Sequence, residues 1–165
     1  MQTRAAGDTE KSLEFRFLAE PTDVNFGGKV HGGAVMKWID QAAYACAVQW
    51  TSSYCVTASV YGLEFLHPVK IGNLVTVSAQ VIDTGRTSVR VLVTVHAMDL
   101  RTRHTGMTTR CLMTLVAMDD LGRPSPIRRL LLESEEDRRL ADLGTRVAEL
   151  GKTVRRSLDL ELPGH

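Results

Sequence analysis

Apolar and polar positions recur along this chain with two different periods, which separate predicted helices from predicted strands. In residues 33–50, thirteen of eighteen positions are apolar, enough to cover nearly the whole circumference of a helix. Residues 74–83 and 87–98 instead alternate at every second position, as strands with one buried face do. The pattern therefore predicts one buried helix and a set of amphipathic strands.

Three further segments complete the predicted sheet. Residues 15–19 form a short extended piece before the helix, residues 56–65 are rich in β-branched and aromatic side chains, and residues 105–118 give a last strand. Short connections with Gly and Pro turn signals make the strands antiparallel. We expect an α+β fold of one strand, the helix and a meander of four strands, with the sheet curled around the helix in the hot-dog arrangement.

A second helix is predicted at the C-terminal end. Apolar residues recur there at helical spacing amid charges: Leu140, Leu143, Val147, Leu150 and Val154. Gly144 and Gly151 weaken the prediction of a single unbroken helix. We expect it to pack against its own domain or a neighbouring subunit. The predicted organisation is a polar tail (1–12), one hot-dog domain (13–127) and a C-terminal helical extension (128–165).

One central helix covers only one face of the predicted sheet. The other face and the edges need protection from water, and self-association is the usual solution. We therefore expect a homodimer as the minimal unit, with a tetramer or hexamer as larger assemblies.

Composition narrows the range of functions. Lys and Arg total 20 against 19 Asp and Glu, so no overall field favours nucleic acid or a membrane surface. No apolar run is long enough for membrane insertion and the first residues lack a signal-peptide core, which predicts a cytoplasmic protein. Cys46, Cys55 and Cys111 are odd in number and lack metal-type spacing, so we expect buried reduced thiols and neither a metal nor a resident cofactor.

One acid, Asp40, lies within the apolar helix. A buried carboxylate costs several kcal/mol unless it is paired or hydrogen-bonded, so Asp40 either braces another segment or takes part in chemistry. The glycine-rich loop before the helix carries Asn25 and His31. By themselves, Asn25 is typical of a turn, and His31 is either a base or a residue that packs in the loop.

These residues, with three segments downstream, resemble the hot-dog acyl-CoA thioesterases of the YciA and brain acyl-CoA hydrolase type. The resemblance covers about residues 15–125 and excludes the chain after Arg128. The downstream segments are Val56-Thr-Ala-Ser-Val, Phe65-Leu-His-Pro-Val-Lys-Ile-Gly and Gly85-Arg-Thr-Ser. The family pattern is filled by Asn25, Gly28, His31, Gly32, Gly33 and Asp40, with a departure at His31, where relatives often carry Phe.

The resemblance implies hydrolysis of acyl-CoA to a free acid and coenzyme A. It makes Asp40 the general base or the nucleophile, and Asn25, reaching from the partner subunit, a group that positions the water or the carbonyl. The N–H groups at Gly32 and Gly33 would hold the thioester oxygen at the helix start. Seven residues is about two helical turns, so Asp40 is expected on the same face as Gly33 and near the same reaction centre.

The remaining implied contacts are to the coenzyme A part of the substrate. His31 would line the pantetheine channel, Arg86 suits a phosphate, and the hydroxyls of Thr87 and Ser88 suit pantetheine amides. Without the resemblance, residues 85–88 are simply a hairpin turn.

Two other functions stay open. A hot-dog hydratase or dehydratase would use His31 with an acid, but the expected His-Phe-Pro-Gly type of loop is absent from the sequence. A non-catalytic acyl-CoA-binding module would be expected to lack the acid or to carry a DNA-binding segment. Asp40 is present and no such segment is recognisable, which favours the thioesterase.

Overall fold

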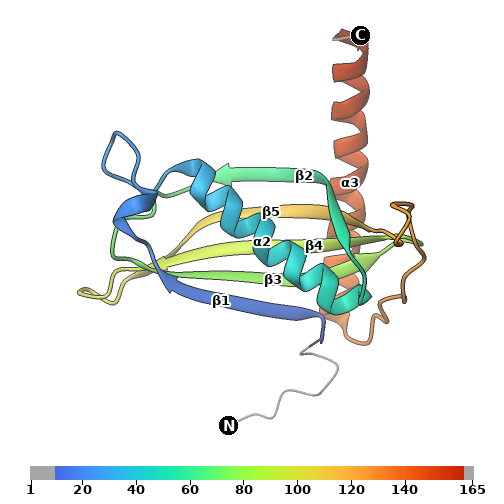
Figure 1. Ribbon diagram of the computed structural model, residues 1–165, viewed down its shortest axis with the longest axis horizontal. Coiled ribbons are helices and arrows are strands. Elements are labelled where there is room, and N and C mark those ends of the chain that lie inside the picture. The colour runs from blue at the N-terminus through green and yellow to red at the C-terminus, as the bar shows by residue number, and fades with distance from the viewer. Residues whose placement is uncertain (1–9, 162–165) are drawn as a thin grey trace.

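The computed structural model describes residues 10–161 and contains a five-stranded antiparallel sheet with a long helix on each face (Figure 1). The elements are β1 (Ser12–Leu18), the 3-10 helix η1 (Pro21–Asp23), α2 (Gly32–Thr51), β2 (Cys55–Phe65), β3 (Leu74–Thr84), β4 (Ser88–Met98), β5 (Thr105–Ala117) and α3 (Glu135–Glu161). Each predicted strand and both predicted helices are present. Most of the predicted N-terminal tail lies outside the described residues.

The order of the strands differs from the predicted meander. The sheet runs β1-β3-β4-β5-β2, so β3, β4 and β5 form a meander while β2 lies at the edge beside β5. The connection from β2 to β3, residues 66–73, is longer than a typical hairpin loop. It crosses the end of the sheet under the start of α2, where Val30 N–H donates to the Val69 carbonyl (3.0 Å) and Val69 is buried.

The main core lies between α2 and one face of the sheet. Alternate residues of β3 and β4 point into it, as the period-two pattern predicted: Val75, Val77, Ala79, Val81, Val89, Val91, Val93 and Val95. The buried side of α2 packs on them through Val35, Ile39, Ala42, Ala43, Cys46, Ala47 and Trp50. All three cysteines are buried and free, which confirms the prediction of reduced thiols.

The prediction that α2 is buried all round is wrong for the single chain. Met36 and Tyr44 are 46% and 39% exposed, and Asp40 between them is exposed too. These three positions are one turn apart, so they form one flank of the helix. The apolar content of α2 therefore exceeds what one copy of the chain covers.

The second helix, α3, covers part of the opposite face of the sheet. A smaller core forms there from Ile82, Leu112 and Leu140. The helix is unbroken through both glycines, contrary to the doubt that the sequence raised. A Cβ on Gly144 would lie 3.1 Å from Ile82 Cδ1, and one on Gly151 would collide with the Tyr61 ring. The glycines thus let α3 approach the sheet closely.

No helix in residues 10–161 is long and apolar enough to cross a membrane.

Candidate active site

The loop before α2 is a tight turn organised by Asn25. Its side-chain oxygen accepts hydrogen bonds from Gly27 N–H (2.8 Å) and Lys29 N–H (3.2 Å), and its own N–H donates to the Lys29 carbonyl (2.6 Å). Gly28 at φ +75° adopts the left-handed conformation that the turn requires. Because the turn uses the oxygen, the Nδ2 amide donors of Asn25 are the groups that remain for a ligand.

His31 ends this loop as the N-cap of α2. Its Nδ1 accepts a hydrogen bond from Gly33 N–H at 3.0 Å, and its carbonyl accepts from the N–H groups of Ala34 (2.9 Å) and Val35 (3.3 Å). Of the two N–H groups predicted to be free at the helix start, that of Gly33 is therefore already hydrogen-bonded. Within residues 10–161, Gly32 N–H is the first-turn donor of α2 without a hydrogen-bond partner, and it is the candidate for holding a carbonyl oxygen.

Asn25 and Gly32 lie together in one hollow. This pocket, about 330 Å³ in volume, is also lined by Phe65 at the end of β2 and by His67 and Pro68 in the following connection. A Cβ on Gly32 would lie 3.4 Å from the Phe65 ring, so glycine keeps the approach to the N–H open beside that ring. The structure thus brings two of the predicted site residues, Asn25 and Gly32, together at the start of α2.

Asp40 belongs to a second cluster farther along α2. Its Oδ1 accepts a hydrogen bond of 2.8 Å from the hydroxyl of Thr57 on β2. Eight residues of helix separate Asp40 from Gly32, a rise of about 12 Å. The expectation that Asp40 and the glycines of one chain share a single reaction centre is therefore wrong, because a thioester carbonyl cannot contact both.

The turn at residues 85–88 lies at the other end of the molecule. The carbonyl of Arg86 accepts a hydrogen bond from Ile127 N–H (3.0 Å), close to Arg128, whose carbonyl accepts from the indole of Trp50 at the C-terminal end of α2 (3.3 Å). Arg86 is exposed, and Thr87 and Ser88 are half-buried. Within one chain, this turn and the loop that precedes α2 lie at opposite ends of that helix (Figure 1).

Sequence reasoning missed Thr57 and Phe65 as individual residues. Both lie in segments that carried the family resemblance, yet nothing in the local pattern distinguishes Thr57 from Ser59. Their importance depends on how β2 is placed against α2. That placement is a tertiary property, which the period of apolar positions does not encode.

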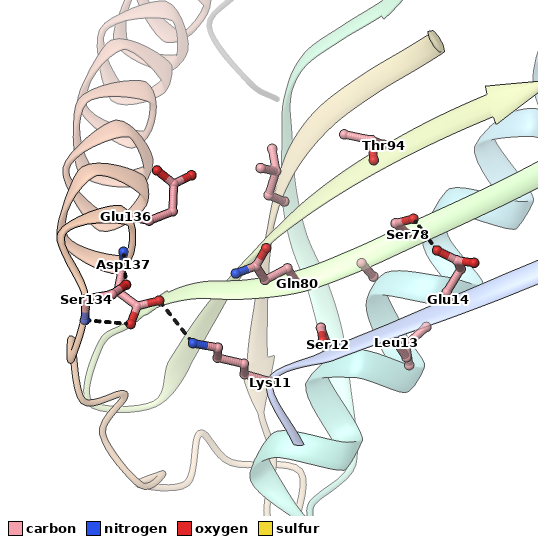
Figure 2. Close-up of a pocket in the computed structure, with 12 residues that line it drawn as sticks. Lys11, Ser12, Leu13, Glu14, Ser78, Gln80, Thr94, Ser134, Glu136 and Asp137 are labelled. Atoms are coloured by element: carbon pink, nitrogen blue, oxygen red, sulfur yellow. Dashed lines mark hydrogen bonds and ion pairs between the residues drawn. The ribbon is translucent and has the colours of Figure 1, made fainter. Parts of the chain in front are cut away.

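A polar hollow of about 420 Å³ between the start of β1 and the start of α3 contains none of the predicted site residues (Figure 2). Lys11 Nζ lies 3.0 Å from Asp137 Oδ1, and Asp137 and Ser134 exchange the two hydrogen bonds of a capping box. Burial raises the pKa of Asp137, but hydrogen bonds from Lys11 and Ser134 outweigh burial, leaving that pKa below its ordinary value. These contacts fix α3 to β1.

The sequence matches the family model described as the thioesterase superfamily over residues 27–103. It is 36% identical over 115 residues to protein VdlD of Helicobacter pylori, covering 70% of this chain and 66% of that one. It is 31% identical over 118 residues to the acyl-CoA thioester hydrolase YciA of Salmonella typhimurium, covering 70% of this chain and 89% of the relative.

A solved structure of an apo-hexameric acyl-CoA thioesterase superposes with a TM-score of 0.85 at 31% identity, covering 90% of this chain and 95% of that one. This likeness confirms the hot-dog fold. The chain belongs to the thioesterase superfamily and, within it, to the family of YciA-type acyl-CoA thioester hydrolases. The chain spans about two thirds of VdlD and most of YciA.

Proposed function

We propose that this protein hydrolyses acyl-CoA thioesters to a carboxylic acid and coenzyme A, in a site built from two copies of the chain. The observation that carries the proposal is the pair of separated half-sites: a pocket with Asn25 and the Gly32 N–H, and an exposed carboxylate, Asp40, held by Thr57. One half-site offers hydrogen-bond donors and the other a base. Thioester hydrolysis needs both within a few ångströms.

The exposed flank of the molecule supports assembly through β2. Within the described residues β2 pairs only with β5, so its outer edge is open. Large apolar side chains are exposed on this strand, just before it and on the adjacent α2 flank: Met36, Tyr44, Tyr54, Val60 and Phe65. An open edge beside apolar surface is a typical interface between copies. An antiparallel two-fold pairing of β2 would bring the start of α2 in one copy toward the middle of α2 in the other.

The chemistry then follows from the two half-sites. The Gly32 N–H and the Asn25 amide of one copy hold the thioester oxygen, and Asp40 of the other copy faces the carbonyl carbon. Asp40 either takes a proton from an attacking water or attacks the carbon itself, forming an anhydride that water hydrolyses. In both routes the C–S bond breaks and coenzyme A leaves as a thiolate, which needs little acid assistance because thiols have a pKa of about 8.5.

The proposed role of Thr57 is to position the Asp40 carboxylate. Its hydroxyl donates to Oδ1, which leaves Oδ2 for the water or the carbonyl carbon. The residues 85–88 of the second copy, which lie far from Asn25 in one chain, are then brought closer to the same pocket. We retain Arg86, Thr87 and Ser88 as proposed contacts to coenzyme A on this basis.

The test is to incubate the pure protein with acyl-CoAs of different chain length and a thiol-detecting dye. Hydrolysis releases one thiol per substrate. A hydratase would change the acyl group without releasing thiol, and a binding module would do neither. Burial raises the pKa of Cys46 to about 12 and that of Cys111 to about 11, so these thiols contribute little background. Absence of thiol release from every acyl-CoA would contradict the proposal.

A further inference from the structure

The C-terminal half of α3 extends past the edge of the sheet. Figure 1 shows the helix crossing behind the strands and continuing beyond β2. Gly151 lies against Tyr61 of β2, and residues 152–161 are all exposed. Ten helical residues rise about 15 Å, the width of about three strands. A helix of this length without tertiary cover is marginal in water, so this segment calls for a partner surface.

One flank of α3 carries a continuous apolar row, here called the α3 seam. Its members recur every three or four residues: Leu143, Val147, Leu150, Val154 and Leu158. The last three are 68%, 59% and 53% exposed. Leu143 and Val147 are half-buried and line a hollow of about 420 Å³ over the outer face of β2, β4 and β5. Val154 and Leu158 line a second hollow of about 620 Å³ beside residues 58–62 of β2, yet more than half of each side chain stays exposed.

The middle of the seam lies at the sheet edge. Leu150 is the central member and is adjacent to Gly151, which contacts β2. In the proposed dimer the two-fold axis passes beside that same edge. The rotation places a second α3 alongside the first in the opposite direction, so the exposed Val154 and Leu158 of one copy face the hollow at Leu143 and Val147 of the other.

The charges of α3 fit this antiparallel direction. Residues 135–149 carry five acidic and three basic side chains, whereas residues 150–161 carry three basic and two acidic ones. An antiparallel pair brings the net acidic half of each helix against the net basic half of the other. A parallel pair would put like charges together.

We propose that α3 is a dimerisation arm, whose seam packs antiparallel against the α3 seam of a second copy, with the two Leu150 side chains meeting near the two-fold axis. This inference rests on the proposed β2 dimer and adds a second contact on the outer face of the sheet. It assigns a role to a helix that lies outside the matched thioesterase model, which ends at residue 103.

Cysteine cross-linking tests the arm directly. In Leu150→Cys the new thiol should lie against the same thiol of the second copy, so mild oxidation should convert most of the protein into a covalent dimer. The matched control is Leu160→Cys, which is 82% exposed on the same helix but lies off the seam. It should give little covalent dimer. The native thiols are buried in both variants. Equal cross-linking of both variants, or none at Leu150→Cys, would overturn the arm.

Charge insertion gives a second readout. Val154→Asp with Leu158→Asp should raise the dimer dissociation constant at least about tenfold, whereas Leu160→Asp should leave it unchanged, both measured by sedimentation. A seam variant that dissociates like its control contradicts the arm alone. A wild-type protein that sediments as a monomer contradicts both the arm and the two-copy active site, whereas thiol release from acyl-CoA tests the reaction itself.

Discussion

Asp40 is the residue on which the proposed chemistry depends. It lies on an exposed flank of α2 and accepts a hydrogen bond from Thr57, so the side chain is oriented and still accessible to a second copy. A carboxylate in an otherwise apolar stretch lowers stability if assembly of two copies buries that stretch. The hydrogen bond from Thr57 and the exposed apolar neighbours Met36 and Tyr44 are the observations behind the role proposed for Asp40.

Replacing this acid should abolish most of the activity. We expect Asp40→Asn to lower kcat by two or more orders of magnitude while leaving the fold and coenzyme A binding intact, because an amide is neither a base nor a nucleophile. Steady-state kinetics with the thiol assay measures the effect. Asp120→Asn, an exposed acid in the turn after β5, is the matched control and should behave as wild type. Near-normal turnover in Asp40→Asn would remove Asp40 from the mechanism.

The rate of the reaction should depend on the hydroxyl group of Thr57 more than on the shape of the side chain. Thr57→Val removes the donor to Asp40 with little change in volume, and we expect kcat to fall about tenfold or more with KM nearly unchanged. Thr57→Ser retains a hydroxyl and should recover most of the rate. If the Val and Ser variants are equally active, the hydrogen bond to Asp40 is not used in catalysis.

The family resemblance proposed Asn25, the two glycines and Asp40 as site residues, and the motif that carries it is local to one loop and one helix. It proposed His31 as a residue that lines the pantetheine channel but did not foresee its capping bond to Gly33 N–H, which depends on the conformation of the loop. Nor could it separate Gly32 from Asp40 in space: both belong to the same motif, but a straight helix keeps them about 12 Å apart.

At the scale of elements, α2 and the strands follow from periodicity, whereas their order in the sheet does not. The alternating valines of β3 and β4 fixed which face is buried. The pairing of β2 with β5 depends on residues 66–73 crossing under α2, a path that no local pattern specifies. The packing of α3 through Gly144 and Gly151 was likewise not predicted. Glycine has a low helix propensity, and its advantage here is apparent only from the close approach of α3 to the sheet.

The anchoring of α3 should depend on pH through Asp137. Because the folded-state pKa of Asp137 lies below its ordinary value, its ionised form stabilises the fold above the unfolded pKa of about 3.9, and this contribution is lost as pH falls through the folded value. We expect Asp137→Asn to lower the free energy of unfolding by about 1 to 2 kcal/mol at pH 7 and by less at pH 3.

Urea unfolding at the two pH values measures this difference. Glu136→Gln, on the same turn but exposed, is the control and should have a smaller effect. An equal loss of stability for Asp137→Asn at both pH values would mean that the carboxylate charge is unimportant and that only the shape of the cap matters.

At the scale of the whole molecule, the two proposed half-sites lie apart in one chain, and within residues 10–161 the outer edge of β2 has no paired strand. The proposed two-copy site accounts for the exposure of Asp40, the apolar side chains along β2, and the distance of residues 85–88 from Asn25. The sequence predicted association but not its geometry, which depends on which strand lies at the open edge.

The contact of Arg86 with coenzyme A should show as a binding effect. We expect Arg86→Ala to raise KM for acyl-CoA more than it lowers kcat, since a contact to a distant phosphate is made equally in the ground and transition states. The effect should shrink as salt rises, because an exposed ion pair is screened over about 8 to 10 Å. Pantetheine thioesters without the nucleotide are the control, and equal weakening of both substrates would assign Arg86 to the turn alone.

The central claim is a site shared between two copies, and mixing two inactive variants tests it most directly. Asn25→Ala and Asp40→Asn chains should each be nearly inactive. After subunit exchange at equal amounts, half of the dimers are mixed and each mixed dimer regains one intact site, so about a quarter of the wild-type activity should return. Recovery near that level is the predicted result. No recovery, with exchange verified by mass spectrometry of mixed dimers, would contradict the account and place each site within a single chain.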